Sequence, residues 1–363
     1  MLTLDQFDYT LPEELIAQQP LVERDQSKLL TINRHSQRIE HHHFYELPAL
    51  LQQYSPTQFV LVRNNTKVLP ARIFGQKQTG GHVEILLIKR HTISSQGETW
   101  ECLTKPGLKP GQNIGFDHSA LTATCTKIDN YTRLIQFNQA GSTLFNTLYE
   151  IGHTPLPPYI EWNTQDEPHL RKIYQTVYAK YEGSVAAPTA GFHFTESLNQ
   201  QLLDQGVSIE EVTLHVGLGT FLPVKEKKIS DHLMHSEWFE LKPEVAAKLN
   251  LAKASGKKII SVGTTTTRVL ETASDEQGHL TAQSGETEIY IYPPYRYKFI
   301  DGLITNLHLP KSTLLMLVAA FVSAPNTAHQ FTDFTSSSVG KAYLEAIQQH
   351  YRFYSFGDSM FLL

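Results

Sequence analysis

A switch in hydrophobic period divides this chain of 363 residues and limits its fold more than any other feature. Between residues 71 and 150, short runs of alternating apolar and polar residues follow one another, among them HVEILLIKR, TWECLTK and TRLIQF. Turn signals such as Gly80-Gly81 and Asp129-Asn130 separate these runs, and no stretch of helical period lies between them. Half a dozen short strands in about 80 residues predict a small antiparallel β-barrel of the Greek-key type.

Outside this segment the pattern is that of an α/β domain. After about residue 155, helices and strands alternate along the chain. Strands are predicted at 209–216, 257–263, 287–292 and 302–306, and helices at 195–205, 243–256, 264–273 and from residues 312 and 338. Strand-like runs at 28–33 and 58–63 precede the barrel segment. We therefore expect a discontinuous α/β domain of residues 1–70 and 151–363, into which residues 71–150 are inserted as a β-barrel domain.

The composition excludes several classes of protein. The 36 acidic side chains against 31 Lys and Arg give a formal net charge of -5, which excludes a globally basic nucleic-acid binder. The longest apolar stretch, residues 314–322, is about half as long as a bilayer span, and the N-terminus has neither a basic start nor an apolar core. Cys102 and Cys125 form no CxxC pair. We expect a cytoplasmic monomer, not bound to a membrane, with both thiols reduced.

A loop of small residues, GSVAAPTAGFHF at 183–194, ends in an aromatic–His–aromatic triplet. Such a loop can lie flat against a ligand, although an ordinary tight crossover between packed elements has the same composition. His193 is a candidate catalytic group, and Glu182, just before the loop, could act as a base or accept a ribose hydroxyl. The candidate binding residues in the loop are Thr189, Gly191 and Phe192.

A strand that runs into a glycine turn, EVTLHVGLGTF at 211–221, suggests a nucleotide site at first reading. The third glycine of a dinucleotide-type turn is missing, and Leu222-Pro223 disfavours a helix directly after it. A Rossmann turn is therefore disfavoured. Gly217 and Gly219 still allow a close approach of backbone to a ligand, and His215 beside them is a titratable group at a strand end.

Two further segments place polar groups at helix starts. VGTTTTRVLE predicts an anion site at a helix N-terminus, formed by hydroxyls and free backbone N–H groups, with Thr264, Thr265 and Arg268 as its residues. The alternative is an ordinary, well-capped helix with Arg268 on its surface. GLITNLHLPKST holds polar residues in a loop after a strand, where α/β folds place their sites. Those residues are Asn306, His308 and Lys311, with Asp301 just upstream; alternatively, Lys311 only begins the next helix.

The remaining candidates are weaker. Three adjacent histidines at 41–43 point in different directions and have no carboxylate at ligand spacing, so we expect no metal site. Small basic groups, such as Arg296 and Lys298 beside Tyr295 and Tyr297, could meet a phosphate backbone and stack on bases, or could be solvated surface.

Taken together, several long blocks resemble the S-adenosylmethionine:tRNA ribosyltransferase-isomerase family of queuosine biosynthesis. These blocks include LVRNNTKVLPARIFG, GSVAAPTAGFHFT, VTLHVGLGTFLPV and DGLITNLHLPKSTLLMLVAAF, and the resemblance runs from FDYTLPEELIAQQP to the C-terminus. It implies an α/β domain with an inserted barrel. It also implies transfer of the ribosyl group of S-adenosylmethionine to 7-aminomethyl-7-deazaguanine at the wobble position of tRNAs with GUN anticodons. The products are epoxyqueuosine-tRNA, adenine and methionine, with no metal or other cofactor.

The implied chemistry needs a general base, because a sulfonium acidifies the adjacent 5′ carbon of its ribose. Residue type and motif position suggest His215 or His193 as this base and Asp301 or Glu182 as a partner acid or orienter. The anion site at Thr264, Thr265 and Arg268 would bind a carboxylate or phosphate, and Asn306, His308 and Lys311 would hold substrate. Two alternatives remain, an S-adenosylmethionine-dependent RNA methyltransferase and a non-catalytic RNA-binding protein.

Overall fold

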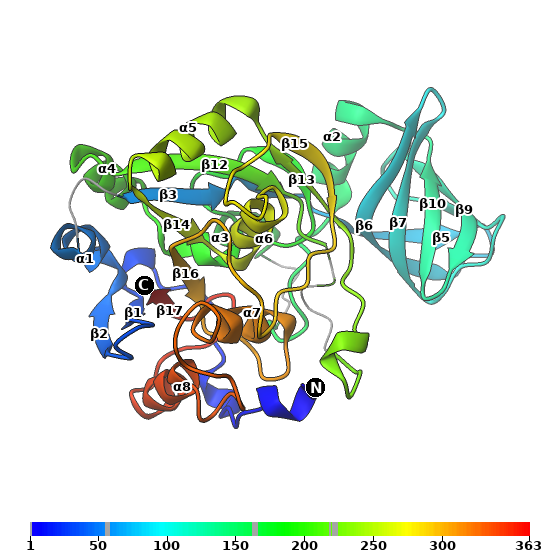
Figure 1. Cartoon of the computed structure of the whole chain (residues 1–363). Helices are drawn as coiled ribbons and strands as arrows, with labels where there is room; N and C mark the ends of the chain where they lie inside the picture. The colour runs from blue at the N-terminus through cyan, green and yellow to red at the C-terminus, as the bar shows by residue number, and fades with distance from the viewer. Residues whose placement is uncertain (1, 55–58, 162–165, 218, 220–223) are drawn as a thin grey trace.

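A nine-stranded mixed sheet forms the centre of the larger domain (Figure 1). The computed structural model describes residues 2–54, 59–161, 166–217, 219 and 224–363. The strands, in their order across the sheet, are β15 (Gln283–Thr287), β13 (Glu237–Leu241), β12 (Ser208–Leu214), β3 (Phe59–Asn64), β14 (Lys258–Val262), β16 (Gly302–Asn306), β17 (Ser359–Leu362), β1 (Lys28–Ile32) and β2 (Ile39–His43). The four neighbours β12, β3, β14 and β16 are parallel, so their carboxyl ends lie at one edge.

Helices cover both faces of this sheet, so apolar residues of its central strands are buried on both sides. In β3, Val60 and Val62 join one hydrophobic cluster, and Phe59 and Leu61 join another. The first cluster contains α5 (Pro243–Ala254), α6 (Thr264–Thr272), α7 (Thr313–Phe321) and α8 (Ser338–Gln348). The second contains α1 (Leu47–Tyr54) and α4 (Glu196–Asp204). Thr195 and Ser312 cap α4 and α7 with their side chains, as their types favour.

A closed antiparallel barrel stands beside the main sheet, at the right of Figure 1. Its strands, in order around the barrel, are β10 (Thr132–Phe137), β7 (Gly97–Lys105), β6 (His82–Ser94), β5 (Arg72–Lys77), β8 (Asn113–Gly115) and β9 (Thr122–Asp129). Alternate residues such as Ile85, Leu87 and Trp100 fill its interior, where Cys102 and Cys125 lie as free thiols. The predicted fold class, an α/β domain with an inserted small antiparallel barrel, is confirmed.

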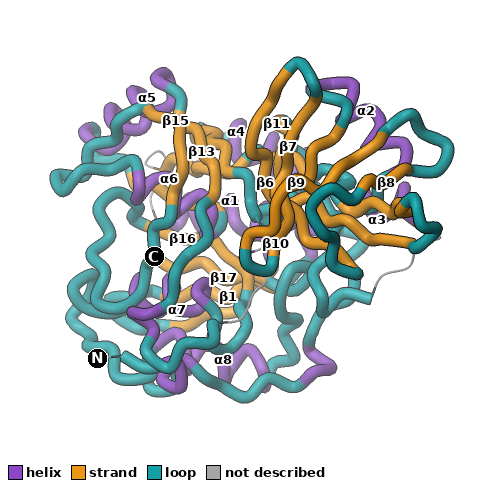
Figure 2. The backbone as a smooth tube through the Cα atoms, turned by 90° about the vertical axis from the view of Figure 1, so that its right-hand side faces the viewer, coloured by secondary structure: helices purple, strands orange, loops and turns teal. Residues whose placement is uncertain are grey.

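Short elements connect the two domains. The chain enters the barrel through β4 (Thr66–Val68), which pairs in parallel with β11 (Tyr181–Ser184), and it leaves the barrel into α2 (Gly141–Ile151). Helix α3 (Glu167–Ile173) precedes β11. Figure 2 shows β11 close to the barrel strands β6 and β7, and β11 contacts β6. In the described part of the chain, no helix has the length and apolar character needed to span a bilayer.

One predicted strand, at 287–292, is wrong for all but its first residue. Only Thr287 lies in a strand, because β15 pairs with β13 at the edge of the sheet and ends there. The alternating tyrosines pack instead against helices: the Tyr290 hydroxyl lies 2.9 Å from the sulfur of Met316, and the rings of Tyr290 and Tyr292 are 4.6 Å apart. Aromatic burial therefore produced a strand-like pattern without strand pairing.

Candidate functional site

The carboxyl edge of the four parallel strands holds two neighbouring hollows. An inner pocket of about 70 Å³ lies over the ends of β14 and β16, and a cleft of about 400 Å³ lies between the main sheet and the barrel. The segment after β12 separates them, because Val216 lines the inner pocket, whereas His215 and Gly217 line the cleft. The polar segments predicted to meet at strand ends therefore do meet, at a divided cavity.

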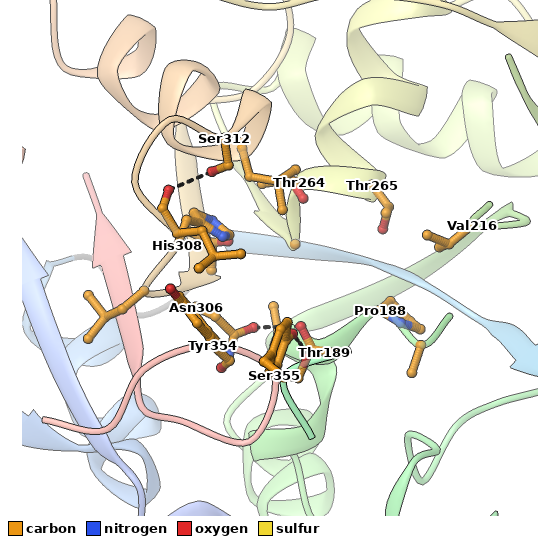
Figure 3. Close-up of a pocket in the computed structure, with 18 residues that line it drawn as sticks. Pro188, Thr189, Val216, Thr264, Thr265, Asn306, His308, Ser312, Tyr354 and Ser355 are labelled. Atoms are coloured by element: carbon orange, nitrogen blue, oxygen red, sulfur yellow. Dashed lines mark hydrogen bonds between the residues drawn. The ribbon is translucent and has the colours of Figure 1, made fainter. Parts of the chain in front are cut away.

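The inner pocket receives the N-termini of α6 and α7 (Figure 3). Gly263 precedes α6 at φ 90° and offers no side-chain cap, so the first amides of the helix stay available to a ligand. The alternative of a helix that is only well capped by its threonines is wrong, because the N-cap is Gly263 and the hydroxyls of Thr266 and Thr267 donate to carbonyls of the preceding turn. Thr264 is 7% exposed and lines the pocket, and its hydroxyl makes no hydrogen bond among the described residues. This end of the pocket is suited to an anion.

A hydrogen-bonded chain fixes the opposite wall of the inner pocket. The Thr189 hydroxyl donates to Oδ1 of Asn306 at 3.0 Å, and Nδ2 of Asn306 donates to Nε2 of His193 at 3.2 Å. Nδ1 of His193 bonds to the Ser27 hydroxyl at 2.7 Å. Burial, with smaller effects of nearby arginines, lowers the pKa of His193 to about 3. His193 is therefore a neutral, fully bonded residue that orients Asn306, and neither ring nitrogen is free to remove a proton.

His308 also lines the inner pocket, after the end of β16. Its Nε2 bonds to the Thr305 hydroxyl at 2.9 Å, and Nδ1 has no hydrogen-bond partner among the described residues. Burial lowers the pKa of His308 to about 3, so the ring is neutral near pH 7. This arrangement fits the predicted role in holding substrate.

His215 is the histidine of the cleft. The Thr66 hydroxyl donates to the Tyr181 carbonyl at 3.4 Å, which leaves its oxygen to accept from Nδ1 of His215 at 2.8 Å. The network thus assigns the lone pair to Nε2, which lies against Gly183 in the cleft. The ring stacks on Trp238 with centroids 5.0 Å apart. Burial and then the charge of Arg90 lower the pKa of His215 to about 4, so it is an unprotonated acceptor at neutral pH.

Carboxylates of the cleft wall are held by ion pairs. Glu182 on β11 accepts from Nζ of Lys67 at 2.9 Å and from the Tyr149 hydroxyl at 2.8 Å. Glu237 on β13 accepts from the backbone N–H of Gly217 at 2.8 Å and pairs with buried Arg268. The Arg268 side chain therefore neutralises Glu237 and does not line the inner pocket, contrary to the predicted anion-binding role and to the surface alternative.

Several other predicted residues lie away from both hollows. Asp301 precedes β16, at the opposite edge of the sheet, where it accepts from the N–H of Ile259 at 2.9 Å. Lys311 pairs with Asp5 and Asp8 at the surface. Gly191 packs so closely that an added Cβ would lie 1.9 Å from the Tyr178 hydroxyl oxygen.

Aromatic residues from two predicted segments also pack inside the protein and do not line the inner pocket or the cleft. Phe192 stacks on Phe356 with ring centroids 5.7 Å apart. The aromatic group near Arg296 is turned inward, because the hydroxyls of Tyr295 and Tyr297 bond to Glu271 and to the Leu317 carbonyl. These tyrosines are therefore not free to stack on bases.

The sequence prediction missed the barrel wall of the cleft. The outer face of β6 and β7 supplies Lys89 and Glu101, and Arg90 lies on the other face of β6, opposite Trp100. Strand β13 of the main sheet supplies Glu237 and Trp238. Only the basic and aromatic character of these strands could have indicated them. Among the described residues, no group of three or more His, Cys, Asp or Glu is arranged to hold a metal ion, and His41 bonds instead to the Tyr351 hydroxyl at 2.8 Å.

Because two histidines are buried in the neutral form, the free energy of unfolding should fall in mild acid. Unfolded His193 and His308 bind protons below about pH 6.5, whereas the folded protein binds them only near pH 3, so stability present above pH 6.5 is lost as the pH falls. Between about pH 7.5 and 5.5 each should cost about 1.4 kcal/mol of unfolding free energy. Denaturant titrations at both pH values measure this loss.

The matched variants are His193→Gln and His82→Gln, since His82 is exposed. The first should reduce the pH-dependent loss by about 1.4 kcal/mol, and the second should leave it unchanged. An equal pH dependence in wild type and His193→Gln would mean that His193 titrates normally in the folded protein.

Comparisons with known proteins agree over the whole chain. A family model described as "Queuosine biosynthesis protein" matches residues 4–362. The crystal structure of an S-adenosylmethionine tRNA ribosyltransferase from Thermotoga maritima is similar, with 34% sequence identity and a TM-score of 0.54. The match covers 99% of this chain and 100% of that chain. It therefore includes the main sheet, the barrel and both hollows.

Proposed function

The chain belongs to the queuosine biosynthesis family, and on this premise we propose that it is an S-adenosylmethionine:tRNA ribosyltransferase-isomerase. It transfers and isomerises the ribosyl group of S-adenosylmethionine onto 7-aminomethyl-7-deazaguanine at the wobble position of tRNAs with GUN anticodons. The products are epoxyqueuosine-tRNA, adenine and methionine, and no metal or other cofactor takes part. The observation that carries this proposal is the divided cavity at the carboxyl edge, with His215 in the larger of its two parts.

The volumes of the inner pocket and the cleft support the binding of different parts of the substrates in each. The inner pocket, about 70 Å³, is too small for a whole nucleoside, whereas the cleft of about 400 Å³ is in the range of small-molecule sites. The methionine end of S-adenosylmethionine fits the inner pocket, where its carboxylate meets the open amides of α6 and the hydroxyls of Thr264 and Thr265. The ribose, its reacting 5′ carbon and the acceptor base then lie in the cleft.

The base of the first step is assigned to His215. Its unprotonated Nε2 lies beside Gly183, which also lines the cleft, and Thr66 fixes the ring through Nδ1, so Nε2 is assigned as the acceptor of the proton that the sulfonium makes acidic. Glu182 remains paired with Lys67, which suits it to orient a ribose hydroxyl better than to donate a proton. Adenine then leaves, the amine of the acceptor attacks, and ring closure to the epoxide expels methionine.

Product analysis tests the proposed function. Purified protein is incubated with S-adenosylmethionine and a GUN tRNA that carries the aminomethyl base, and free adenine, free methionine and the mass of the modified nucleoside are measured. Release of adenine and methionine in equal amounts, unchanged by a metal chelator, supports the proposal. S-adenosylhomocysteine would identify a methyltransferase instead, and tRNA binding with no product would favour a non-catalytic RNA-binding protein. A tRNA with a changed second anticodon base tests the GUN requirement.

The affinity for tRNA should fall steeply with added salt, although the chain carries a net charge of -5. Phosphate contacts by a local group of Lys and Arg release counterions, so the Kd should rise about tenfold or more between about 50 and 200 mM salt. Filter binding or fluorescence anisotropy measures this Kd. A flat salt response would show that the tRNA backbone meets no cluster of basic side chains.

A further inference from the structure

The charged side chains around the cleft are almost all paired. Lys89 bonds to Glu286 at 2.6 Å, and Arg90 lies 3.3 Å from Glu98. Glu182 and Glu237 pair with Lys67 and Arg268 as described above. Glu101 is the exception among the described residues that line the cleft, because the structure gives it neither an ion pair nor a hydrogen bond. The free charge of the cleft wall is therefore negative.

Glu101 has no partner although a lysine lies directly opposite it on the next strand. It lies on β7, where the inward residues Trp100 and Cys102 fill the barrel and Glu101 faces outward to the cleft. Its cross-strand neighbour on β6 is Lys89, the expected partner of a carboxylate at this register. Lys89 instead reaches across to Glu286 on β15 of the main sheet. The barrel's own lysine thus leaves Glu101 free.

An exposed aromatic ring lines the same cleft as this carboxylate. Tyr131 is 58% exposed, and both Tyr131 and Glu101 line the cleft. Burial, and then the charge of Glu101, raises the pKa of Tyr131. A cleft that holds both an exposed ring and an unpaired carboxylate can bind a flat heterocycle that carries a cationic arm.

We propose that Glu101 binds the ammonium of the acceptor's aminomethyl group and takes one of its protons to give the neutral amine that attacks, and that the barrel thereby selects the modified base. The inference rests on the proposed function and names the part of the cleft that recognises its substrate. A ligand that closes over Glu101 removes water from the carboxylate, which is unfavourable unless a cation replaces that water. An alkylammonium supplies this cation, whereas a phosphate would be repelled. An unmodified guanine at the same position has no group to pair with Glu101.

Glu101 could also pair with another small organic cation, the ammonium or sulfonium of S-adenosylmethionine. The test therefore compares wild type with Glu101→Gln in two measurements. The first is the ratio of the Kd for tRNA with guanine to the Kd for tRNA with the aminomethyl base at the wobble position, and the second is the KM for S-adenosylmethionine. Wild type should prefer the modified tRNA by about tenfold or more, as expected for a charge-assisted hydrogen bond. Glu101→Gln should lose this preference with an unchanged KM for S-adenosylmethionine.

Two control variants separate this effect from general electrostatics and from misfolding. Asp117→Asn removes an exposed carboxylate of the barrel that does not line the cleft, so it should keep the preference and bind tRNA equally or slightly more tightly. Glu101→Asp keeps the charge on a shorter arm and should retain part of the preference. Thermal unfolding midpoints of all variants should match the wild type.

The outcomes are distinct. A Glu101→Gln variant that keeps the preference overturns the inference, as does a wild type with no preference. A rise in the KM for S-adenosylmethionine with the tRNA preference intact would assign the carboxylate to the donor and also overturn it. Because the Kd ratio needs no turnover, these results are read separately from adenine release, which tests the proposed function itself.

Discussion

Replacement of His215 by Ala should reduce turnover about a hundredfold or more while the protein stays folded. The imidazole is unprotonated near pH 7, since burial lowers its pKa to about 4. The Thr66 hydroxyl holds Nδ1, and Nε2 lies beside Gly183, which lines the cleft together with His215. Loss of this ring removes the proton acceptor and leaves the binding surfaces in place. Adenine release under saturating substrates measures the effect, with the Kd of S-adenosylmethionine as a separate readout.

The control is His82→Ala, an exposed histidine of the barrel, which should turn over normally. Thr66→Val is a graded test: it removes the hydroxyl that fixes the tautomer of His215 and should cost part of the rate, with little change in KM. Near wild-type turnover in His215→Ala would place the base elsewhere. His308 would then be the next candidate, because its Nδ1 is free of partners among the described residues, whereas both nitrogens of His193 are bonded.

Gly183→Ala should produce a loss of similar size although it replaces no titratable residue. A Cβ at this position would lie 2.6 Å from Nε2 of His215 and 2.8 Å from two of its ring carbons. The backbone at φ +148° is also one that residues with a Cβ rarely adopt, at a cost of about 1–3 kcal/mol. The imidazole must therefore leave its place between Thr66 and Trp238. Turnover and a pH–rate profile measure the change.

Gly285→Ala is the matched control for this substitution. Gly285 also lies in a strand near the cleft side of the sheet, but a Cβ there meets nothing within 4 Å. It should retain normal turnover. If Gly183→Ala were equally active, the ring of His215 would have room to move and the close fit at Gly183 would have no catalytic importance.

Strand polarity explains which parts of the site could be predicted from sequence. His215 and Gly263 each directly follow a parallel strand, Asn306 ends another, and the carboxyl ends of such strands share an edge. The same rule argues against Asp301, because that residue precedes β16 and so lies at the other edge. The helix ends at Thr195 and Ser312 were predictable for a local reason, since each side chain caps its own first turn.

Contacts between distant segments could not be predicted in this way. Arg268 is buried against Glu237, a residue from another strand, and nothing in the helical pattern distinguishes it from a surface arginine. The barrel was predictable from its period, but its orientation was not, because alternation shows only which residues face outward. Whether Glu101 meets solvent or the main sheet depends on how the two domains dock.

The connection into the barrel has a mechanical consequence. Strand β4 holds Thr66 against His215 and pairs with β11, and only Leu69, Pro70 and Ala71 separate it from the first barrel strand. The strand that holds the imidazole and the first strand of the barrel are therefore covalently joined through three residues. The position of the barrel and the orientation of His215 are set by the same short stretch of chain.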